Sequence, residues 1–400
     1  MINIDPKKID ELLNRGVQDV LPSRDALRAK LLSGKKLKIY LGIDPTSPLV
    51  HIGHISTFNK LRQFQELGHE VVVLVGDFTA IAGDPDKTET RNILSDDQIK
   101  ENMETYKSQI SKIINFEGEN AATFVRNSEW LSKLDFRQVL ELASKFTVQQ
   151  MLERDNFQKR IANQTPIRLH EFLYPLMQGY DSVSMNVDVE LGGNDQLFNM
   201  MAGRTLMREM NNKEKFVVTG KLITDSSGKK IGKTDGNAWS LSLKPIDVFG
   251  KIMANPDGTI IQCFEQLTNM SLEDIEVKRL DLENGINPME LKKELAHKIV
   301  SQYYSEKDAD QAKEYFEKTF QEKDTSEVKE ARYDVGSQSV SEVIVGLGFA
   351  SSKTQAKSLI EQGAVEMNGK KVETDKEKIE NNSIFKVGKK NIVKLIFDNE

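Results

Sequence analysis

The chain has 400 residues, of which 38% are hydrophobic, and a formal net charge of −6. This length predicts two or three domains with substantial cores. No run approaches the roughly 18 apolar residues of a membrane span, and the first residues resemble neither a signal peptide nor a transit peptide, so we expect a cytoplasmic protein. The single cysteine, Cys263, excludes an intramolecular disulfide and a multi-cysteine zinc site.

A net negative charge is unusual for a dedicated nucleic-acid binder, but the charge is unevenly distributed. Residues 336–400 carry ten lysines against nine acidic residues, so the negative excess lies in the rest of the chain. The C-terminal segment is therefore the part that repels RNA least.

The first predicted elements form a strand–helix–strand unit. The apolar run 37–43 predicts a strand, followed by turn residues at 44–48. Apolar side chains then recur at helical spacing from Ile52 to Leu67, and residues 69–77 predict a second buried strand. Such a unit implies a parallel sheet with a right-handed crossover.

The pattern of the remaining chain predicts further helices and strands around this unit. Residues 95–180 are mostly helical in pattern, with a strand end between 123 and 130, and strands are predicted at 187–193 and 215–223. A glycine- and lysine-rich loop follows at 225–237, then several helices over 246–320. The polar stretch 321–338 predicts a connection to a final domain.

Two of the chain's five histidines, His51 and His54, fall in the first turn of the predicted helix after the first strand. They share one face of that helix, and Gly53 between them leaves room for a flat group to approach the backbone. A helix N-terminus with two imidazole donors suits a phosphate that gains charge in a transition state. Taken alone, the two side chains could equally cap or pack the helix.

Lys229, Lys230 and Lys233 lie close together in the loop 225–237, with Gly228 and Gly232 beside them. A basic loop of this kind can clamp a polyphosphate, although by itself it could also be an exposed turn. It is not a P-loop, because the GxxxxGK[ST] pattern is absent.

Tyr174, Gln178 and Asp181 are spaced so that all three face one way on a helix. Spacing alone leaves open a solvated face. A buried polar stripe, in contrast, needs hydrogen-bonding partners, which a ligand can supply.

These motifs resemble those of the class I aminoacyl-tRNA synthetases, with HIGH after a strand and a KMSKS-type loop downstream. The more specific resemblance is to the bacterial tyrosyl-tRNA synthetases, over most of the chain and in the same order. The segments that carry it are 40-YLGIDPTSPLVHIGH-54, 76-GDFTAIAGDP-85, 171-EFLYPLMQGYDSV-183, 191-LGGNDQLFN-199 and 229-KKIGKTDGN-237, with 338-QSVSEVIVGLGFASSKTQAKSLIEQGAVEMNGKKV-372 similar to an S4 RNA-binding module.

The sequence departs from the family pattern at two places. The signature loop is KIGKT, which keeps both lysines but replaces Met and two Ser of KMSKS. The loop 83-GDPDKTETR-91 lacks the usual Ser-Gly after GDP, which leaves open whether Lys87 or Arg91 reaches the phosphates.

The resemblance implies an α/β fold with three parts joined by a linker. These are a Rossmann-like parallel-sheet nucleotide-binding domain at 1–245, a helical anticodon-binding region at 246–325, a linker at 326–336 and a small α+β S4-like RNA-binding domain at 337–400.

The family reaction has two steps. The carboxylate of L-tyrosine attacks the α-phosphate of ATP to give tyrosyl-adenylate and pyrophosphate, and the tyrosyl group then passes to the 3′ end of tRNA(Tyr). The resemblance also implies a homodimer, Mg²⁺ accompanying ATP, no metal held by protein side chains and no membrane partner.

The site residues implied by the resemblance fall into groups. The catalytic group is His51, His54, Lys230, Lys233 and Thr234. ATP binding involves Thr46, Gly53, Gly193, Asp195, Lys230 and Lys233, with Gly42 permitting close approach. For tyrosine, Tyr40 and Asp181 bind the phenol, Tyr174, Gln178 and Asp84 hold the ammonium group, and Asn127 and Gln196 are near the same pocket. tRNA binding involves Ser351, Ser352, Lys353, Lys357, Lys370 and Lys371, the last two in a predicted tight turn 368-NGKK-371.

Two other functions compete with this hypothesis. A tryptophan-specific enzyme of the same fold is disfavoured by Asp181 and Tyr40, because an indole has no hydroxyl for them to bind. An RNA-binding protein that lost catalysis is disfavoured by the intact HIGH motif and both loop lysines. Adenylate formation would distinguish the tyrosine-specific enzyme from such a protein, which would bind RNA without forming an adenylate.

Overall fold

The computed structural model describes residues 1–84, 95–224, 239–321, 330–333, 339–388 and 391–397. The predicted loop residues Lys230, Lys233 and Thr234 lie outside these ranges, as do Lys87 and Arg91.

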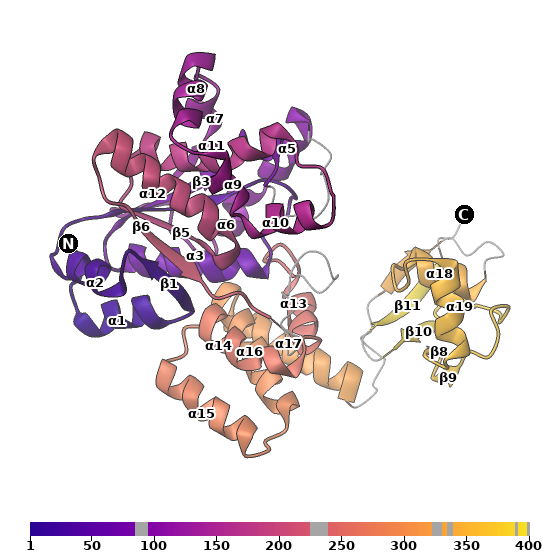
Figure 1. The fold of residues 1–400 in the computed structure, drawn as a ribbon. Coiled ribbons are helices and arrows are strands. Elements are labelled where there is room, and N and C mark those ends of the chain that lie inside the picture. The colour runs from indigo at the N-terminus through magenta and orange to yellow at the C-terminus, as the bar shows by residue number, and fades with distance from the viewer. Residues whose placement is uncertain (85–94, 225–238, 322–329, 334–338, 389–390, 398–400) are drawn as a thin grey trace.

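A six-stranded sheet forms the centre of the N-terminal part (Figure 1). Its strand order is β1-β6-β5-β2-β3-β4, and every neighbouring pair is parallel except β1 and β6. The strands are β1 (Val17–Leu21), β2 (Lys38–Ile43), β3 (Glu70–Val75), β4 (Thr123–Arg126), β5 (Val189–Gly193) and β6 (Phe216–Gly220). The predicted parallel sheet is thus confirmed, with each predicted strand in place.

Strand β1 was not predicted, and it extends the sheet at the β6 edge in the antiparallel direction. Its five residues alternate only partly between buried and exposed positions, so the sequence carries little period-2 signal there.

Helices cover both faces of this sheet. The crossover helix α3 (Ile52–Glu66) packs against β2, β3 and β5. Helices α11 (Leu169–Met185) and α12 (Leu197–Asn211) pack tightly together on the other side of the sheet (Figure 1). The other helices of this part are α1 (Pro6–Asn14), α2 (Arg24–Leu32), α4 (Thr79–Ala82), α5 (Asp96–Met103), α6 (Tyr106–Ile110), α7 (Ser128–Leu131), α8 (Phe136–Ser144), α9 (Val148–Leu152), α10 (Asp155–Ala162) and the 3₁₀ turn η1 (Asn194–Gln196).

The strand order reverses between β2 and β5. The chain runs outward from β2 through β3 to β4, and then returns to place β5 and β6 on the other side of β2. In open parallel sheets, ligands bind at such a switch point, outside the carboxyl ends of the strands. The fold therefore predicts a site where β2 and β5 end.

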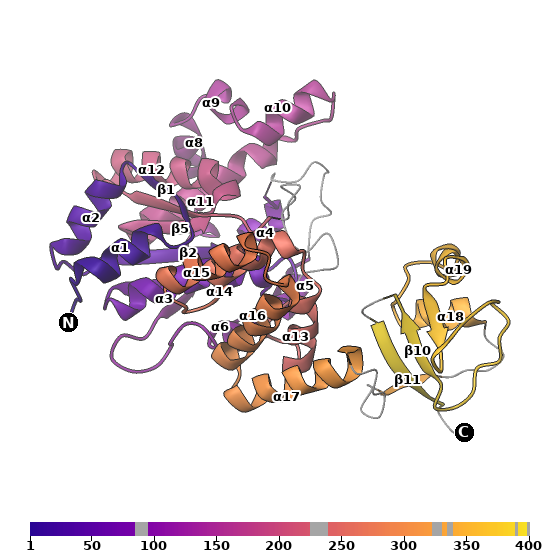
Figure 2. The ribbon, with the colours of Figure 1, turned by 90° about the horizontal axis from the view of Figure 1, so that it is seen from below.

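The helical region continues the core of the sheet domain. Its elements are α13 (Pro245–Met253), η3 (Asp257–Thr259), α14 (Ile260–Leu267), α15 (Leu272–Glu283), α16 (Pro288–Tyr303), α17 (Glu306–Phe316) and η4 (Glu317–Gln321). Helix α14 packs against α3 of the sheet domain, and α15 and α16 pack against α14 (Figure 2). One cluster of buried apolar residues spans both regions. Among the described residues, no helix combines the length and apolar character that a bilayer crossing requires.

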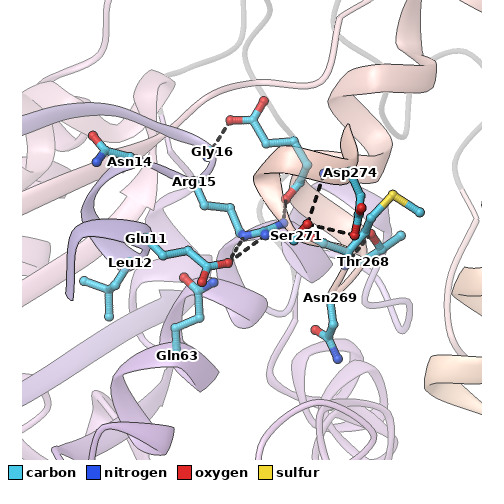
Figure 3. Close-up of polar contacts among 12 residues, drawn as sticks. Glu11, Leu12, Asn14, Arg15, Gly16, Gln63, Thr268, Asn269, Ser271 and Asp274 are labelled. Carbon is cyan, nitrogen blue, oxygen red and sulfur yellow. Dashed lines mark hydrogen bonds and ion pairs between the residues drawn. The ribbon is translucent and has the colours of Figure 1, made fainter. Parts of the chain in front are cut away.

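Arg15 fixes the N-terminal segment against this helical region (Figure 3). Its guanidinium donates to the carbonyl oxygens of Glu265 at 3.1 Å and Met270 at 2.5 Å, and it also pairs with Glu11. The Glu265 carboxylate accepts from the backbone N–H of Gly16 at 2.8 Å. The bond to the Glu265 carbonyl satisfies a group in the last turn of α14, which the helix leaves without a partner, and the bond to Met270 adds a contact with the segment before α15.

The C-terminal domain has a separate five-stranded sheet and its own buried core. The strand order is β7-β11-β10-β8-β9. Its elements are β7 (Glu330–Tyr333), α18 (Val340–Gly346), α19 (Lys353–Glu361), β8 (Val365–Met367), β9 (Lys370–Lys371), β10 (Ile384–Val387) and β11 (Asn391–Phe397). The predicted tight turn is confirmed, because Asn368 and Gly369 have φ of 53° and 78° between β8 and β9.

The predicted linker 326–336 needs a correction. Residues 330–333 form β7, which pairs in parallel with β11 at the edge of the C-terminal sheet. The strand is short, and the ion pair between Glu330 and Lys394 joins it to its neighbour. Such a charged edge strand has the composition of a linker, which is why the sequence did not reveal it.

Candidate active site

A cavity of about 380 Å³ lies at the carboxyl ends of β2 and β5 and the N-terminus of α3. We call it the active-site cavity. It brings together every predicted ATP and tyrosine residue within the described ranges: Tyr40, Gly42, Thr46, His51, Gly53, His54, Asp84, Asn127, Tyr174, Gln178, Asp181, Gly193, Asp195 and Gln196. The switch point of the sheet and the motifs therefore indicate the same place.

His51 is the N-cap of α3, and its Nδ1 accepts a hydrogen bond from the backbone N–H of Gly53 at 3.2 Å. The His51 and His54 rings stack with centroids 3.7 Å apart. A Cβ at position 53 would lie 3.2 Å from the His51 ring, so glycine leaves the two imidazoles undisturbed. His51 therefore caps α3, as one of the two alternatives predicted, and it also lines the cavity.

The segment after the lysine-rich loop is attached to the same helix start. The backbone N–H of Ile52 donates to the Trp239 carbonyl at 3.0 Å, and His51 forms a β-bridge with Ser240. On the other side of the loop, the side chain of Gln262 bonds both the N–H and the C=O of Thr224, at 3.0 and 3.3 Å. The described residues on both sides of segment 225–238 are therefore held by hydrogen bonds, and Ile223 beside Thr224 lines the cavity.

Asp181 is 2% exposed in the cavity wall. Its carboxyl accepts from Trp130 Nε1 at 2.7 Å and Asn127 Nδ2 at 3.2 Å. Burial raises the pKa of Asp181 well above its usual range, and these two hydrogen bonds oppose the rise. The buried Tyr40 hydroxyl, which pairs with Ser182 Oγ at 3.0 Å, lines the same cavity. Two polar groups thus face a space that can hold a phenol.

A second polar cluster lines the cavity nearer to α4. Tyr174 donates its hydroxyl proton to Asp44 Oδ2 at 2.7 Å, and Thr79 donates to the other oxygen at 2.8 Å. Burial, followed by the charge of Asp44, raises the pKa of the Tyr174 hydroxyl well above its usual range. Tyr174 therefore stays protonated, and its oxygen keeps a lone pair.

Asp84 belongs to this cluster and is held on both oxygens. Arg154 donates to Oδ1 at 2.6 Å, and Gln196 Nε2 donates to Oδ2 at 2.7 Å. The Gln196 amide oxygen in turn accepts from Asn199 Nδ2 at 2.9 Å. This part of the cavity therefore contains two carboxylates, Asp44 and Asp84, whereas the sequence analysis predicted only Asp84.

Glycine at position 193 leaves room for the Asp195 side chain. A Cβ there would lie 2.4 Å from Asp195 Oδ1, so the carboxylate would have to move. The Asp195 carboxylate therefore lies directly against the end of β5. It lines the same cavity as the N-terminus of α3.

The predicted tRNA residues lie in the C-terminal domain and are exposed. Ser352 is the N-cap of α19, Lys353 pairs with Glu342 at 2.7 Å, and Lys357 lies 3.5 Å from Asp375. Lys370 and Lys371 form β9. The two basic groups on α19 are therefore already paired with carboxylates.

Sequence reasoning missed several residues that shape the cavity. Among them are Asp44, Thr79, Trp130, Arg154, Ser182, Glu190 and Lys215. One signal was available: Glu190 is an acidic residue within the otherwise apolar end of a buried strand. The others are ordinary in their local context and become partners only in the folded chain.

Comparison with known proteins connects this geometry to a family. Residues 32–321 match the family model described as class I tRNA synthetases (W and Y), and residues 317–394 match the tyrosine–tRNA ligase SYY-like C-terminal domain. The chain is 41% identical over 97% of both chains to a tyrosine–tRNA ligase of Carboxydothermus hydrogenoformans. It is 42% identical to tyrosine–tRNA ligase 2 of Vibrio parahaemolyticus, over 96% of this chain and 97% of that protein.

Solved structures share the fold at lower sequence identity. A C-terminally truncated mitochondrial tyrosyl-tRNA synthetase of Aspergillus nidulans matches 78% of this chain and 94% of its own with a TM-score of 0.65 and 23% identity. The tyrosyl-tRNA synthetase of Archaeoglobus fulgidus complexed with L-tyrosine matches 77% of this chain and 100% of its own, with a TM-score of 0.61 and 22% identity. Because both family models match and the relatives are about 40% identical over nearly the full length, the chain belongs to the class I tRNA synthetases, in the tyrosine–tRNA ligase family.

Proposed function

We propose that this chain activates L-tyrosine with ATP and transfers the tyrosyl group to tRNA(Tyr). The observation that carries the choice of amino acid is the buried pair of Asp181 and Tyr40, two polar groups in the wall of the active-site cavity. A substrate without a hydroxyl would displace water from both groups without replacing its hydrogen bonds, which costs far more than a missing apolar contact. Tyrosine-specific synthetases are themselves the known example of this effect, with discrimination of about 10⁵ against phenylalanine, and that value sets the scale to expect.

The ammonium group of the substrate binds at the second polar cluster in this proposal. Tyr174, Gln178 and Asp84 are its partners, with Asp44 adding a second carboxylate nearby. Gln196 acts on the ammonium group through Asp84, to which it donates. Asn127 uses its amide for Asp181, Thr79 and the Phe78 N–H, so we assign it to holding the pocket rather than to the substrate.

Activation needs no general base, because the attacking carboxylate of tyrosine is already ionised. Catalysis then depends on holding the carboxylate in line with the α-phosphate and on stabilising phosphate charge. His51, His54 and the positive dipole end of α3 line the cavity beyond the carboxyl ends of β2 and β5, and the proposal assigns them to the phosphates of ATP. Thr46, Gly193 and Asp195 hold the rest of the nucleotide, and Mg²⁺ enters with ATP as part of the substrate.

Lys230, Lys233 and Thr234 complete the phosphate contacts in this proposal. They lie outside the described residues. Of the described residues that flank their segment, Ile223 lines the cavity and the Trp239 carbonyl accepts from the Ile52 N–H beside His51.

We propose that the C-terminal domain binds tRNA through the N-terminus of α19 and β9. Ser352, Lys353 and Lys357 present hydroxyl and ammonium donors on one helix end, and Lys370 and Lys371 are exposed on the neighbouring hairpin. Donors of this kind position RNA phosphates without reading sequence. We divide the rest of the chain near residue 245 into the nucleotide-binding domain and the helical anticodon-binding region.

We propose further that two copies associate through the α8–α11 side of the nucleotide-binding domain. Large apolar side chains are exposed there on consecutive helices: Phe136 at 77%, Leu140 at 55%, Val148 at 65%, Ile161 at 49% and Leu169 at 85%. A patch of this kind on one side of a protein marks an interaction surface. Since tRNA charging supplies protein synthesis, we place the homodimer in the cytoplasm.

The experiment that tests this function is ATP–pyrophosphate exchange with tyrosine, phenylalanine and tryptophan in parallel. We expect exchange with tyrosine alone. Exchange with tryptophan would overturn the choice of amino acid, and folded protein that binds RNA but exchanges nothing would point to the RNA-binding function without catalysis.

A further inference from the structure

A buried ion pair lies behind the active-site cavity. Lys215, which directly precedes β6, is 0% exposed and forms an ion pair with Glu190 on β5, which is 2% exposed. Removing two charges from water costs several kcal/mol for each, so such a pair stabilises a fold poorly by itself. Its presence beside a substrate pocket therefore calls for a role beyond stability.

The Lys215 ammonium uses all three of its protons. Besides Glu190, it donates to Ser182 Oγ and to the Met200 carbonyl, each at 3.0 Å. A Cβ at Gly203 on α12 would lie 2.5 Å from the Lys215 ammonium, so only glycine admits it. The packing of α11 against α12 is thus shaped around this charge.

Glu190 connects the ion pair to the wall of the substrate pocket. It lies beside Tyr40 in the register of β5 and β2, and it lines the active-site cavity. One carboxylate oxygen accepts from Gln178 Nε2 at 3.0 Å. The other lies 3.4 Å from Ser182 Oγ, which pairs with the Tyr40 hydroxyl.

The chemistry of these groups fixes the orientation of the Gln178 amide. An ionised carboxylate only accepts hydrogen bonds, so the Gln178 nitrogen must face Glu190. The amide oxygen is then the end that remains for a ligand, and an ammonium group requires an acceptor. Lys215 pairs with the other carboxylate oxygen of Glu190, so the ion pair presents its acceptor side to Gln178.

We propose that the Glu190–Lys215 ion pair is a positioning device of the tyrosine pocket, which holds the Gln178 amide with its oxygen toward the substrate ammonium. Through Ser182 it also holds the Tyr40 hydroxyl at the phenol end. In this role Glu190 and Lys215 act on the substrate through Gln178 and Ser182, so both are positioning residues. This inference rests on the proposed role of Gln178 in tyrosine binding.

The test is the double variant Glu190→Gln/Lys215→Met in the full chain. It removes both buried charges together, so neither is left unpaired, and it allows the Gln178 amide to turn either way. We expect the KM for tyrosine in ATP–pyrophosphate exchange to rise about 10-fold to 100-fold, the range for a lost hydrogen bond to a charged group. The KM for ATP should stay within about twofold, since the ion pair does not reach the nucleotide side of the cavity.

A second ligand distinguishes positioning from general damage to the pocket. 3-(4-Hydroxyphenyl)propionate keeps the phenol and carboxylate of tyrosine but lacks the ammonium group. Its inhibition constant should rise much less than the KM for tyrosine in the double variant. Equal losses for both ligands, or an unchanged KM for tyrosine, would overturn the proposal.

Two further proteins complete the design. Glu190→Asp keeps the charge beside Lys215 but shortens the reach to Gln178, so it should show the same preferential loss even if the double variant does not fold. The matched control is Arg160→Met/Glu171→Gln, which removes the buried ion pair between α10 and α11 that does not line the cavity. Wild-type protein that shows no tyrosine-dependent exchange at all would instead count against the proposed function.

Discussion

The tyrosine side of the active-site cavity and the C-terminal domain use charged groups in opposite ways. Asp181, Glu190 and Lys215 are nearly inaccessible to water, and each makes hydrogen bonds to neighbouring protein groups. In the C-terminal domain, Lys353 and Lys357 are exposed and pair with carboxylates across the surface. Electrostatic interactions are strong where water is excluded and weak where it screens them. Selection of the amino acid should therefore depend strongly on single buried residues. RNA binding should depend on the summed contributions of many exposed residues, each of them small.

The strongest test of this contrast is Asp181→Ala. We expect kcat/KM for tyrosine to fall at least about 1000-fold, because the substrate hydroxyl loses its partner and the Trp130 and Asn127 donors lose the carboxyl that they share. ATP–pyrophosphate exchange measures the loss, and tRNA binding by the same protein should be unchanged. Near-normal exchange with tyrosine would show that the buried carboxyl does not select the substrate.

The next largest effect should follow removal of residues 330–400. This boundary takes β7 away with its sheet, and the remaining chain keeps its own core. We expect tyrosyl-adenylate formation within about twofold of the full chain and tRNA charging reduced about 100-fold, as when one of two linked binding surfaces is lost. Full charging by the shortened protein would mean that the C-terminal domain is no tRNA clamp.

A third prediction concerns a buried histidine that makes the free energy of unfolding depend on pH. His69 is 1% exposed, and its Nδ1 accepts from the Leu37 N–H at 3.3 Å. Burial, with a smaller contribution from Lys36, lowers its pKa from 6.5 to about 4. The unfolded chain therefore binds a proton at higher pH than the folded chain does, so the contribution to stability is complete above pH 6.5 and is lost as the pH falls toward 4.

We expect the free energy of unfolding to fall by about 2 kcal/mol from this group between about pH 7 and pH 5, as two-state urea titrations would measure. The variant His69→Gln keeps an acceptor for the Leu37 N–H but does not titrate. The same pH dependence in both proteins would assign the effect to other groups.

The smallest effect should come from the exposed side. Lys353 holds the pKa of Glu342 down to about 2 by a hydrogen bond, and both groups are on the surface. Lys353→Ala should weaken tRNA binding only a few-fold and reduce the slope of log affinity against log salt by about 1, as expected for one phosphate contact. Lys35→Ala, at an exposed position of the nucleotide-binding domain, is the control. An equal loss of tRNA affinity in that variant would show that Lys353 has no specific role.

The site residues divide by how far along the chain their partners lie. Tyr174, Gln178 and Asp181 share a helix face, so their spacing predicted that they would line one site, and all three line the cavity. The pairs Arg154–Asp84 and Lys215–Glu190 join residues that lie 70 and 25 positions apart, and no local pattern relates them. Those partners could not be predicted without the sheet order.

By itself, the sequence determined the strands, the crossover helix and the motif positions, because periodicity and turn chemistry act over a few residues. It did not reveal β1 or β7, two short edge strands whose pairing depends on distant segments. Only the tertiary structure decided which buried polar groups meet, since a buried charge must find its partner among whatever side chains the topology brings beside it. In this chain, the topology placed Lys215 beside Glu190 at the wall of the active-site cavity.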